Sequence, residues 1–298
     1  MSDSLVNLHR KISSAQDLQG VVRTMKAMAA SNIGQYEQSV RALADYDHTV
    51  LTGLGQCFRS MQGMALESPQ ARSAGAAKVG AIIFGSDQGL VGRFNDVVAD
   101  HAIKVLAALP GKPQVWAIGE RVQMRVADAG LTVVGHYALP NAIEAIAQLV
   151  SQIQIDSEAH REANGYEPVY VFHNRPQSGS LYEPVSQRLL PLDAQWQKRV
   201  EAELWPTKLL PEVMGYGTTT LRALISEHLF ISLFRACAES LASENASRLA
   251  AMERADKNIK DLLETLSNTL HSQRQAAIDE ELFDVISGYE ALSSRTQA

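Results

Sequence analysis

A glycine-rich loop is the part of this chain whose residue types and spacing could bind phosphate. The segment Gly85-Ser-Asp-Gln-Gly-Leu-Val-Gly-Arg-Phe-Asn95 follows a predicted strand and leads into a predicted helix, where backbone N–H groups can hold phosphate oxygens. Its glycine spacing, Gly-x-x-x-Gly-x-x-Gly, differs from the dinucleotide fingerprint, and no Gly-Lys-Ser/Thr follows as in a P-loop. The spacing therefore favours a tight structural turn packed at a subunit contact, with nucleotide binding as the alternative.

Metal and thiol chemistry find little support in the residue pattern. The two cysteines, Cys57 and Cys237, lie in predicted helices, and the eight histidines show no Cys-x-x-Cys or His-x-x-x-His spacing. No Gly-x-Ser-x-Gly motif marks a nucleophile. We therefore predict no cofactor and no metal. Met1–Arg10 lacks a basic segment followed by an apolar core, so a cytosolic, reducing setting is expected.

Two helical segments at opposite ends of the chain would have to position any site. Apolar residues recur in steps of three and four along both, which is typical of helices buried along a narrow seam. At about 1.5 Å per residue, helices over 4–61 and 219–287 would be roughly 85 Å and 100 Å long. Neither can bury its stripe alone, so an antiparallel coiled coil is predicted. The expected seam positions are Leu5, Leu8, Ile12, Ala15, Leu18, Val22, Met25, Ala29, Ile33, Tyr36, Val40 and Leu43, and Met252, Ala255, Ile259, Leu263, Leu266, Leu270, Gln273 and Ala277.

Between the helical segments, short apolar strands alternate with helices. Strands are predicted at 79–84, 114–118, 131–137 and 169–172, helices at 95–108, 120–129 and 142–155, and an added edge strand within 181–192. This alternation indicates βαβ units and a parallel sheet covered by helices. The predicted fold class is α/β, a central Rossmann-like domain flanked by long N- and C-terminal helices that form an antiparallel coiled coil. The predicted domains are an N-terminal shaft helix at 1–66, an α/β foot at 71–211 and a C-terminal shaft helix at 218–288.

The composition limits the function classes. The chain is 46% hydrophobic and 20% charged, which is ordinary for a soluble protein. A net charge of -6 argues against a nucleic-acid partner. Charged residues such as Arg10, Lys11 and Arg23 interrupt the first apolar stripe, which excludes a membrane span there.

Three stretches resemble the gamma subunit of F-type ATP synthases, the central rotor shaft. They are residues 12–31, the loop at 86–95, and Leu241-Ala-Ser-Glu-Asn-Ala-Ser-Arg-Leu-Ala-Ala-Met252, which is followed by a match at 274–282. With the helix–α/β–helix order, the resemblance covers nearly the whole chain. Departures at Asp17-Leu18, Gly20, Asn32 and Asp279 are consistent with a diverged branch, such as an alternative ion-translocating F-type ATPase.

The resemblance implies a non-catalytic subunit that couples ion flow to ATP synthesis or hydrolysis. Its implied partners are the alpha and beta subunits of the catalytic hexamer, the epsilon subunit and the membrane c-ring, at the cytoplasmic face of the bacterial inner membrane. Met25 and Lys26 match positions that face a beta-subunit lever, and Arg274 and Gln275 match positions that contact a beta-subunit catch loop. The apolar helix end at 282–286 suggests insertion into a collar formed by other subunits.

Two other function classes remain open from the residues themselves. One is a nucleotide-binding α/β enzyme with coiled-coil dimerisation arms. The other is a coiled-coil adaptor. Nucleotide titration into the purified chain separates the enzyme from the shaft, and a gene neighbourhood that encodes ATPase subunits would exclude the adaptor.

Overall fold

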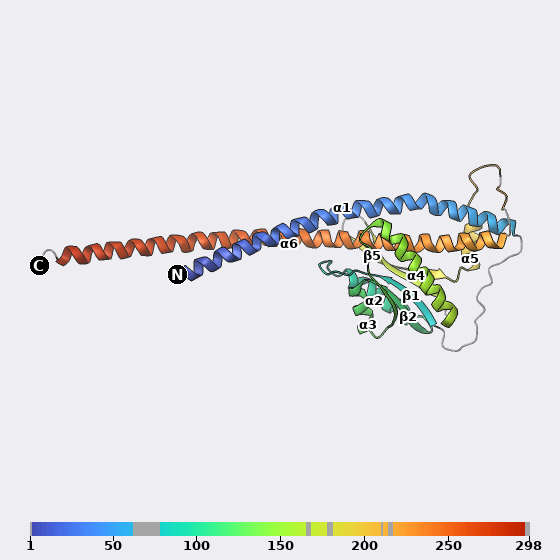
Figure 1. The fold of residues 1–298 in the computed structure, drawn as a ribbon, viewed down its shortest axis with the longest axis horizontal. Helices are drawn as coiled ribbons and strands as arrows, with labels where there is room; N and C mark the ends of the chain where they lie inside the picture. Colours follow the sequence, from blue (N-terminus) through green and yellow to red (C-terminus); the bar gives the residue numbers. More distant parts are fainter. Residues whose placement is uncertain are drawn as a thin grey trace. The chain divides into compact units, whose positions relative to one another are not determined.

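The computed structural model describes residues 2–61, 78–164, 168–177, 181–209, 211–213 and 217–295. The chain divides into two compact units, residues 1–28 with 249–298 and residues 29–248. The elements, labelled in Figure 1, are α1 (Ser2–Ser60), β1 (Lys78–Phe84), α2 (Phe94–Ala107), β2 (Lys112–Ile118), α3 (Glu120–Asp128), β3 (Thr132–Tyr137), α4 (Ile143–Asn164), β4 (Val169–Pro176), β5 (Tyr182–Leu190), α5 (Ala194–Glu201) and α6 (Gly217–Arg295).

A five-stranded sheet forms the centre of the unit at 29–248. Its strand order is β3-β2-β1-β4-β5. The first four strands are parallel, and Ile82 of β1 lies between Trp116 of β2 and Val171 of β4. β5 pairs with β4 in the antiparallel direction. The predicted parallel sheet and its added edge strand are both confirmed.

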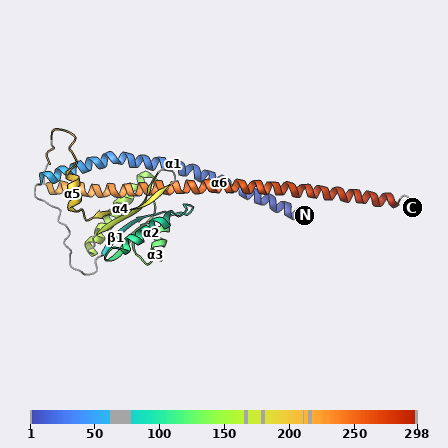
Figure 2. The same ribbon diagram turned by 180° about the vertical axis from the view of Figure 1, so that it is seen from behind.

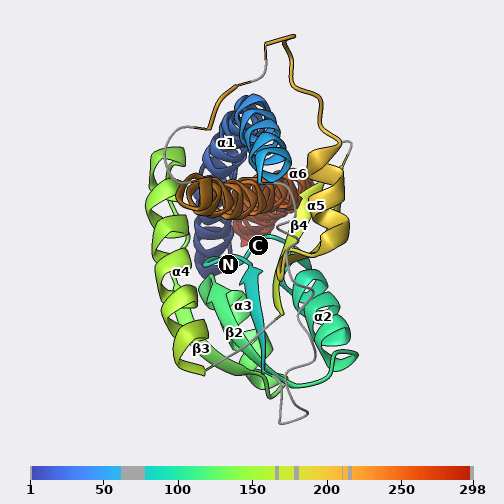
Figure 3. The ribbon, with the colours of Figure 1, turned by 90° about the vertical axis from the view of Figure 1, so that its right-hand side faces the viewer.

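Helices cover both faces of this sheet, which explains why its strands are apolar without alternation. Ile82, Trp116 and Val171 pack toward α4 and α6, in a cluster with Ile146 and Leu241. The alternate residues of the same strands point to the other face of the sheet and pack against α2 and α3. Figure 3 shows α4 and α2 on opposite sides of the sheet. The second cluster contains Val79, Ala81, Ile83, Val115, Ala117 and Phe172 with Val98, Ala99, Ala102, Leu106, Val122 and Val126.

Within the same unit, α1 and α6 run antiparallel to each other. Asn32 Nδ2 donates a hydrogen bond of 3.4 Å to Asn245 Oδ1, and further along α1 Tyr46 Oη donates one of 2.8 Å to Glu227, which lies earlier in α6. The short helix α5 packs against this pair and was not predicted. It begins where Asp193 caps it by accepting a hydrogen bond from Trp196 N at 2.8 Å. The apolar contact joins Val50, Leu54, Cys57 and Phe58 of α1 to Val200 of α5 and to Leu221 and Ile231 of α6.

The other unit consists of the first part of α1 and the last part of α6. These helices are also antiparallel, because Lys26 lies near Glu253 while Arg23 lies near Asp256. Within this unit the end of α6 extends past the beginning of α1, as Figures 1 and 2 show from opposite sides. α1 has the predicted bounds to within two residues, whereas α6 continues beyond the predicted end at 287.

Candidate functional site

The helix pair of residues 1–28 and 249–298 is held by a small apolar cluster. Val22, Met252 and Ile259 are buried there. Partly buried residues surround them: Met25, Ala251, Ala255 and Leu263. Leu266, Leu270 and Gln273 are half-buried, as their place in the predicted seam requires. A slender pair with one apolar stripe on each helix therefore leaves most of its surface available to other molecules.

A polar cluster interrupts this apolar seam, and one predicted seam position is wrong there. Leu18 was placed in the seam, but its side chain is 55% exposed. The neighbouring Gln19 takes its place, and its Nε2 donates to Asp256 Oδ1 at 3.2 Å. Arg23 Nε lies 3.6 Å from the same oxygen, and Lys260 Nζ lies 2.9 Å from Oδ2. A buried carboxylate needs polar partners, so α1 turns Gln19 rather than Leu18 toward α6.

These partners lower the pKa of Asp256 below its usual value, chiefly through Lys260 and then through Gln19 and Arg23. Because the pKa of Asp256 is lower in the folded chain, its carboxylate stabilises the fold at pH values above the pKa that it has in the unfolded chain. This contribution is lost as pH falls through the folded-state pKa. We expect acid to loosen this helix pair, with a weaker response in Asp256→Asn. Hydrogen exchange of amides 249–265, compared between pH 6 and pH 3, measures how far the helix pair loosens. Asp261→Asn, at an exposed carboxylate, is the control and should keep the wild-type response.

The four predicted contact residues fall into two separate places on this pair. Met25 is partly buried in the apolar cluster, and Lys26 Nζ lies 3.9 Å from Glu253 Oε1. Arg274 and Gln275 are exposed, and neither has a hydrogen bond or ion pair with the residues that the structure describes. At about 1.5 Å per residue, Arg274 lies roughly 30 Å along α6 from Glu253, so the structure does not bring the two pairs together.

The end of α6 carries large apolar side chains that face solvent. All side chains from Ile278 to Ser287 are exposed. Exposed groups of large apolar residues are typical of interaction surfaces. The group consists of Ile278, Leu282, Phe283, Val285 and Ile286, with exposed fractions between 46% and 70%.

In the unit at 29–248, the glycine-rich loop is a structural turn. Ser86 N donates to Asn95 Oδ1 at 2.9 Å, and Asn95 Nδ2 donates to Ser86 Oγ at 2.7 Å. Asp87 accepts hydrogen bonds from Glu120 N at 3.0 Å and from Leu139 N at 2.9 Å. A Cβ at Gly85 would lie 2.3 Å from Val122, so only glycine fits there. The loop therefore joins β1, α2, α3 and the end of β3.

The crevice beside this loop is filled by α6. Ligands of open α/β sheets bind at the carboxyl ends of the strands where the strand order reverses, which here is between β1 and β4. Ser247 Oγ donates to Val91 O at 2.5 Å, and Ser243 Oγ donates to Asn174 O at 2.9 Å. Asn174 Nδ2 in turn donates to Phe94 O at 2.9 Å. These contacts occupy the position that a nucleotide would need, and they favour the structural interpretation.

Buried ionisable groups also attach α6 to the sheet, and sequence reasoning missed them. His173 Nε2 lies 2.8 Å from Glu239 Oε2, and Arg175 Nε donates to the same oxygen at 3.2 Å. Burial alone would raise the pKa of Glu239, but His173 and Arg175 outweigh burial and lower it. The signal was indirect: Leu241–Ser247 is rich in small residues, and all of it is buried. The stretch at 241–252, which resembles the gamma-subunit family, thus contains residues that attach α6 to the sheet.

The described part of the chain contains neither a candidate metal site nor a candidate membrane-spanning helix. No group of three or more His, Cys, Asp and Glu side chains among those residues could hold a metal ion. None of the described helices has a stretch that is long and apolar enough to cross a membrane.

Comparison with known proteins matches this arrangement over almost its full length. The family model described as ATP synthase matches residues 4–292. The ATP synthase gamma chain of Cupriavidus necator is 25% identical over 96% of this chain and 98% of its own. The ATP synthase gamma chain of a Cyanothece species is 28% identical over 97% and 99%, respectively.

Solved structures share the fold at lower identity. A chain of the Euglena gracilis mitochondrial ATP synthase, solved as OSCP/F1/c-ring, has a TM-score of 0.67 and 14% identity, and the match covers 100% of this chain and 97% of that one. A chain from the central stalk and c-ring of the Tetrahymena thermophila mitochondrial ATP synthase has a TM-score of 0.55 and 18% identity, with coverage of 79% and 99%. Given the family match over residues 4–292 and gamma-chain relatives that align over nearly their full length, the chain belongs to the gamma-chain family of ATP synthases.

Proposed function

We propose that this gamma chain is the central rotor shaft of an F-type ATP synthase or ATPase. It couples ion flow through the membrane c-ring to ATP synthesis or hydrolysis in the hexamer of alpha and beta subunits. The observation that carries the proposal is the full-length match to gamma chains. The α/β domain acts as the foot, and the paired helices act as the shaft.

The shaft itself is not catalytic in this proposal. Support comes from the crevice at the carboxyl ends of β1 and β4, where Ser243 and Ser247 take the place that a nucleotide would need. The chain works by conformational coupling. An asymmetric shaft contacts each beta subunit differently, and such differential contacts shift one subunit toward an open state and another toward a closed state.

The contact residues of the shaft remain those inferred from the family. Met25 and Lys26 face the beta-subunit lever, and Arg274 and Gln275 reach the catch loop. Support for the second pair is their exposure and their lack of partners among the described residues. The apolar end of α6 at 278–286 lies in the collar above them, where other subunits cover it. The epsilon subunit binds the foot, and the assembly is peripheral to the cytoplasmic face of the bacterial inner membrane.

The purified chain is expected to hydrolyse no ATP and to restore coupled activity when it is mixed with its alpha, beta and epsilon partners and its membrane sector. Steady-state phosphate release from the chain alone, and ion pumping by reconstituted vesicles, measure the two halves of this prediction. A mock preparation purified in parallel is the control. Sustained ATP turnover by the chain alone would favour the enzyme alternative, whereas vesicles that stay uncoupled would favour the adaptor.

A further inference from the structure

Three buried polar side chains form a row along α6 within the unit at 29–248. Glu239, Ser243 and Ser247 follow one another at intervals of four residues, so they lie on one face of the helix, about 6 Å apart along its axis. Each of them is at most 9% exposed. Buried polar groups need partners, and this polar row finds all of its partners in the sheet and its loops.

Glu239 makes the strongest of these contacts. Its Oε2 lies 2.8 Å from His173 Nε2 and accepts a hydrogen bond from Arg175 Nε at 3.2 Å. Although burial alone would raise the pKa of Glu239, His173 and Arg175 lower it, so the carboxylate is charged at neutral pH. Hydrogen bonds to an ionised group are roughly twice as strong as neutral ones. Glu239 is therefore the main point at which α6 is fixed to β4.

The two serines continue the row towards the neighbouring strand. One turn after Glu239, Ser243 Oγ donates to Asn174 O of β4 at 2.9 Å. After a further turn, Ser247 Oγ donates to Val91 O, in the loop that follows β1, at 2.5 Å. Since β1 and β4 pair in the middle of the sheet, the polar row fixes three successive turns of α6 to the centre of the foot.

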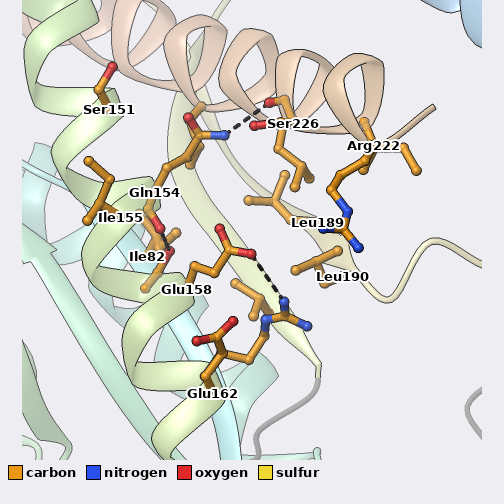
Figure 4. Close-up of a pocket in the computed structure, with 16 residues that line it drawn as sticks. Ile82, Ser151, Gln154, Ile155, Glu158, Glu162, Leu189, Leu190, Arg222 and Ser226 are labelled. Carbon is orange, nitrogen blue, oxygen red and sulfur yellow. Dashed lines mark hydrogen bonds and ion pairs between the residues drawn. The ribbon is translucent and has the colours of Figure 1, made fainter. Parts of the chain in front are cut away.

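The contact between α6 and α4 is of a different kind. Gln154 Nε2 donates to Ser226 O at 3.0 Å, and beside this bond a groove of about 580 Å³ lies open between the two helices (Figure 4). Elsewhere the two helices share an apolar cluster. The hydrophobic effect has no direction, whereas a hydrogen bond weakens steeply when its angle changes. The polar row, more than the α4 contact, therefore opposes rotation of α6 about its own axis.

We propose that the polar row transmits torque between the foot and α6, with Glu239 as its main positioning residue. This inference rests on the proposed function, in which torque passes between the foot and a shaft inside the hexamer. Because the three side chains share one face, a turn of α6 about its axis breaks all of their bonds together. ATP hydrolysis in the hexamer would then turn α6 without turning the foot, and fewer ions would be pumped for each ATP.

The buried thiol of Cys237 reports whether α6 stays on the sheet. Cys237 lies two residues before Glu239, in the apolar cluster that α6 shares with the sheet. In a Cys57→Ala background it is the single thiol of the chain, and its rate of labelling by a maleimide measures how often this contact opens. Glu239→Gln keeps the shape of the side chain but removes its charge, so labelling should become about tenfold faster or more.

The same variants are then assembled with alpha, beta and epsilon subunits and the membrane sector in vesicles. Glu239→Gln should hydrolyse ATP at the wild-type rate and pump fewer ions for each ATP. Ser243→Ala removes a neutral hydrogen bond, so it should fall between wild type and Glu239→Gln in both measurements, and it carries the test if Glu239→Gln does not fold. Glu227→Gln is the matched control, because Glu227 lies on α6 but pairs with Tyr46 of α1, and it should behave as wild type.

Four results would overturn the proposal. Unchanged labelling of Cys237 in Glu239→Gln would show that Glu239 does not hold α6 on the sheet. Faster labelling with wild-type ion pumping per ATP would show that the polar row carries no torque, and would leave the rotor function standing. Parallel losses of ATP hydrolysis and pumping would mean that Glu239 supports only folding or assembly. A wild-type complex that hydrolyses ATP without pumping would overturn the proposed function itself, and this inference with it.

Discussion

Replacing Ile259 by aspartate is expected to separate the helix pair formed by residues 1–28 and 249–298. Ile259 is buried against Val22 and Met252, and losing such an apolar side chain costs about 1.5–3 kcal/mol. The new carboxylate adds a desolvation penalty of several kcal/mol, and Asp256, one turn away, repels it. Circular dichroism should show less helix at 25 °C, and limited proteolysis should cut within 1–28 and 249–285 while fragments that contain β1 to β5 persist.

Leu262→Asp is the matched control for this prediction. Leu262 lies on the same helix, has nearly the same volume, and is 50% exposed. Its replacement should change protease resistance little, because the carboxylate stays in water. If Ile259→Asp and Leu262→Asp behaved alike, the seam would not run through Ile259, and the antiparallel pairing described here would be wrong.

The main elements could be predicted because each has a strong local pattern. The apolar runs at 79–84 and 114–118 lie within β1 and β2, and the steps of three and four trace both long helices. α5 escaped prediction because two turns of helix give too short a period to recognise. Its start was marked only by the capping residue Asp193. The division into shaft and foot domains at 1–66, 71–211 and 218–288 stays a prediction.

The polar interior of the protein could not be predicted from the same patterns. The periodicity of apolar residues does not show which charged residues are buried, and Glu239 and Asp256 are two that are. Their burial depends on partners distant in sequence, namely His173 and Arg175 for Glu239, and Gln19 for Asp256. The seam position at Leu18 was wrong for the same reason. Gln19 pairs with Asp256, so the seam passes through residue 19 instead of residue 18.

Replacing both Arg274 and Gln275 by alanine is expected to leave the stability of the isolated chain unchanged and to lower the ATPase activity or assembly of the complex. Both side chains are exposed and have no partner among the described residues, and alanine is the best helix former. The melting temperature of the isolated chain should therefore stay unchanged or rise slightly. In the complex, each lost charge-assisted hydrogen bond to the catch loop would cost roughly 1.5–3 kcal/mol, which lowers ATPase activity or assembly by about tenfold or more.

A second exposed pair on the same helix separates this contact from a general effect of surface charge. Lys257 and Asn258 also combine a cation with an amide side chain, and neither has a hydrogen bond or ion pair with the described residues. Lys257→Ala/Asn258→Ala removes the same formal charge about 25 Å away along α6. If Arg274 and Gln275 reach the catch loop, only their replacement should lower the activity of the reconstituted complex. Equal losses in both double variants would point to long-range electrostatics, and wild-type activity in both would leave the exposed face of α6 without a catch contact at Arg274 and Gln275.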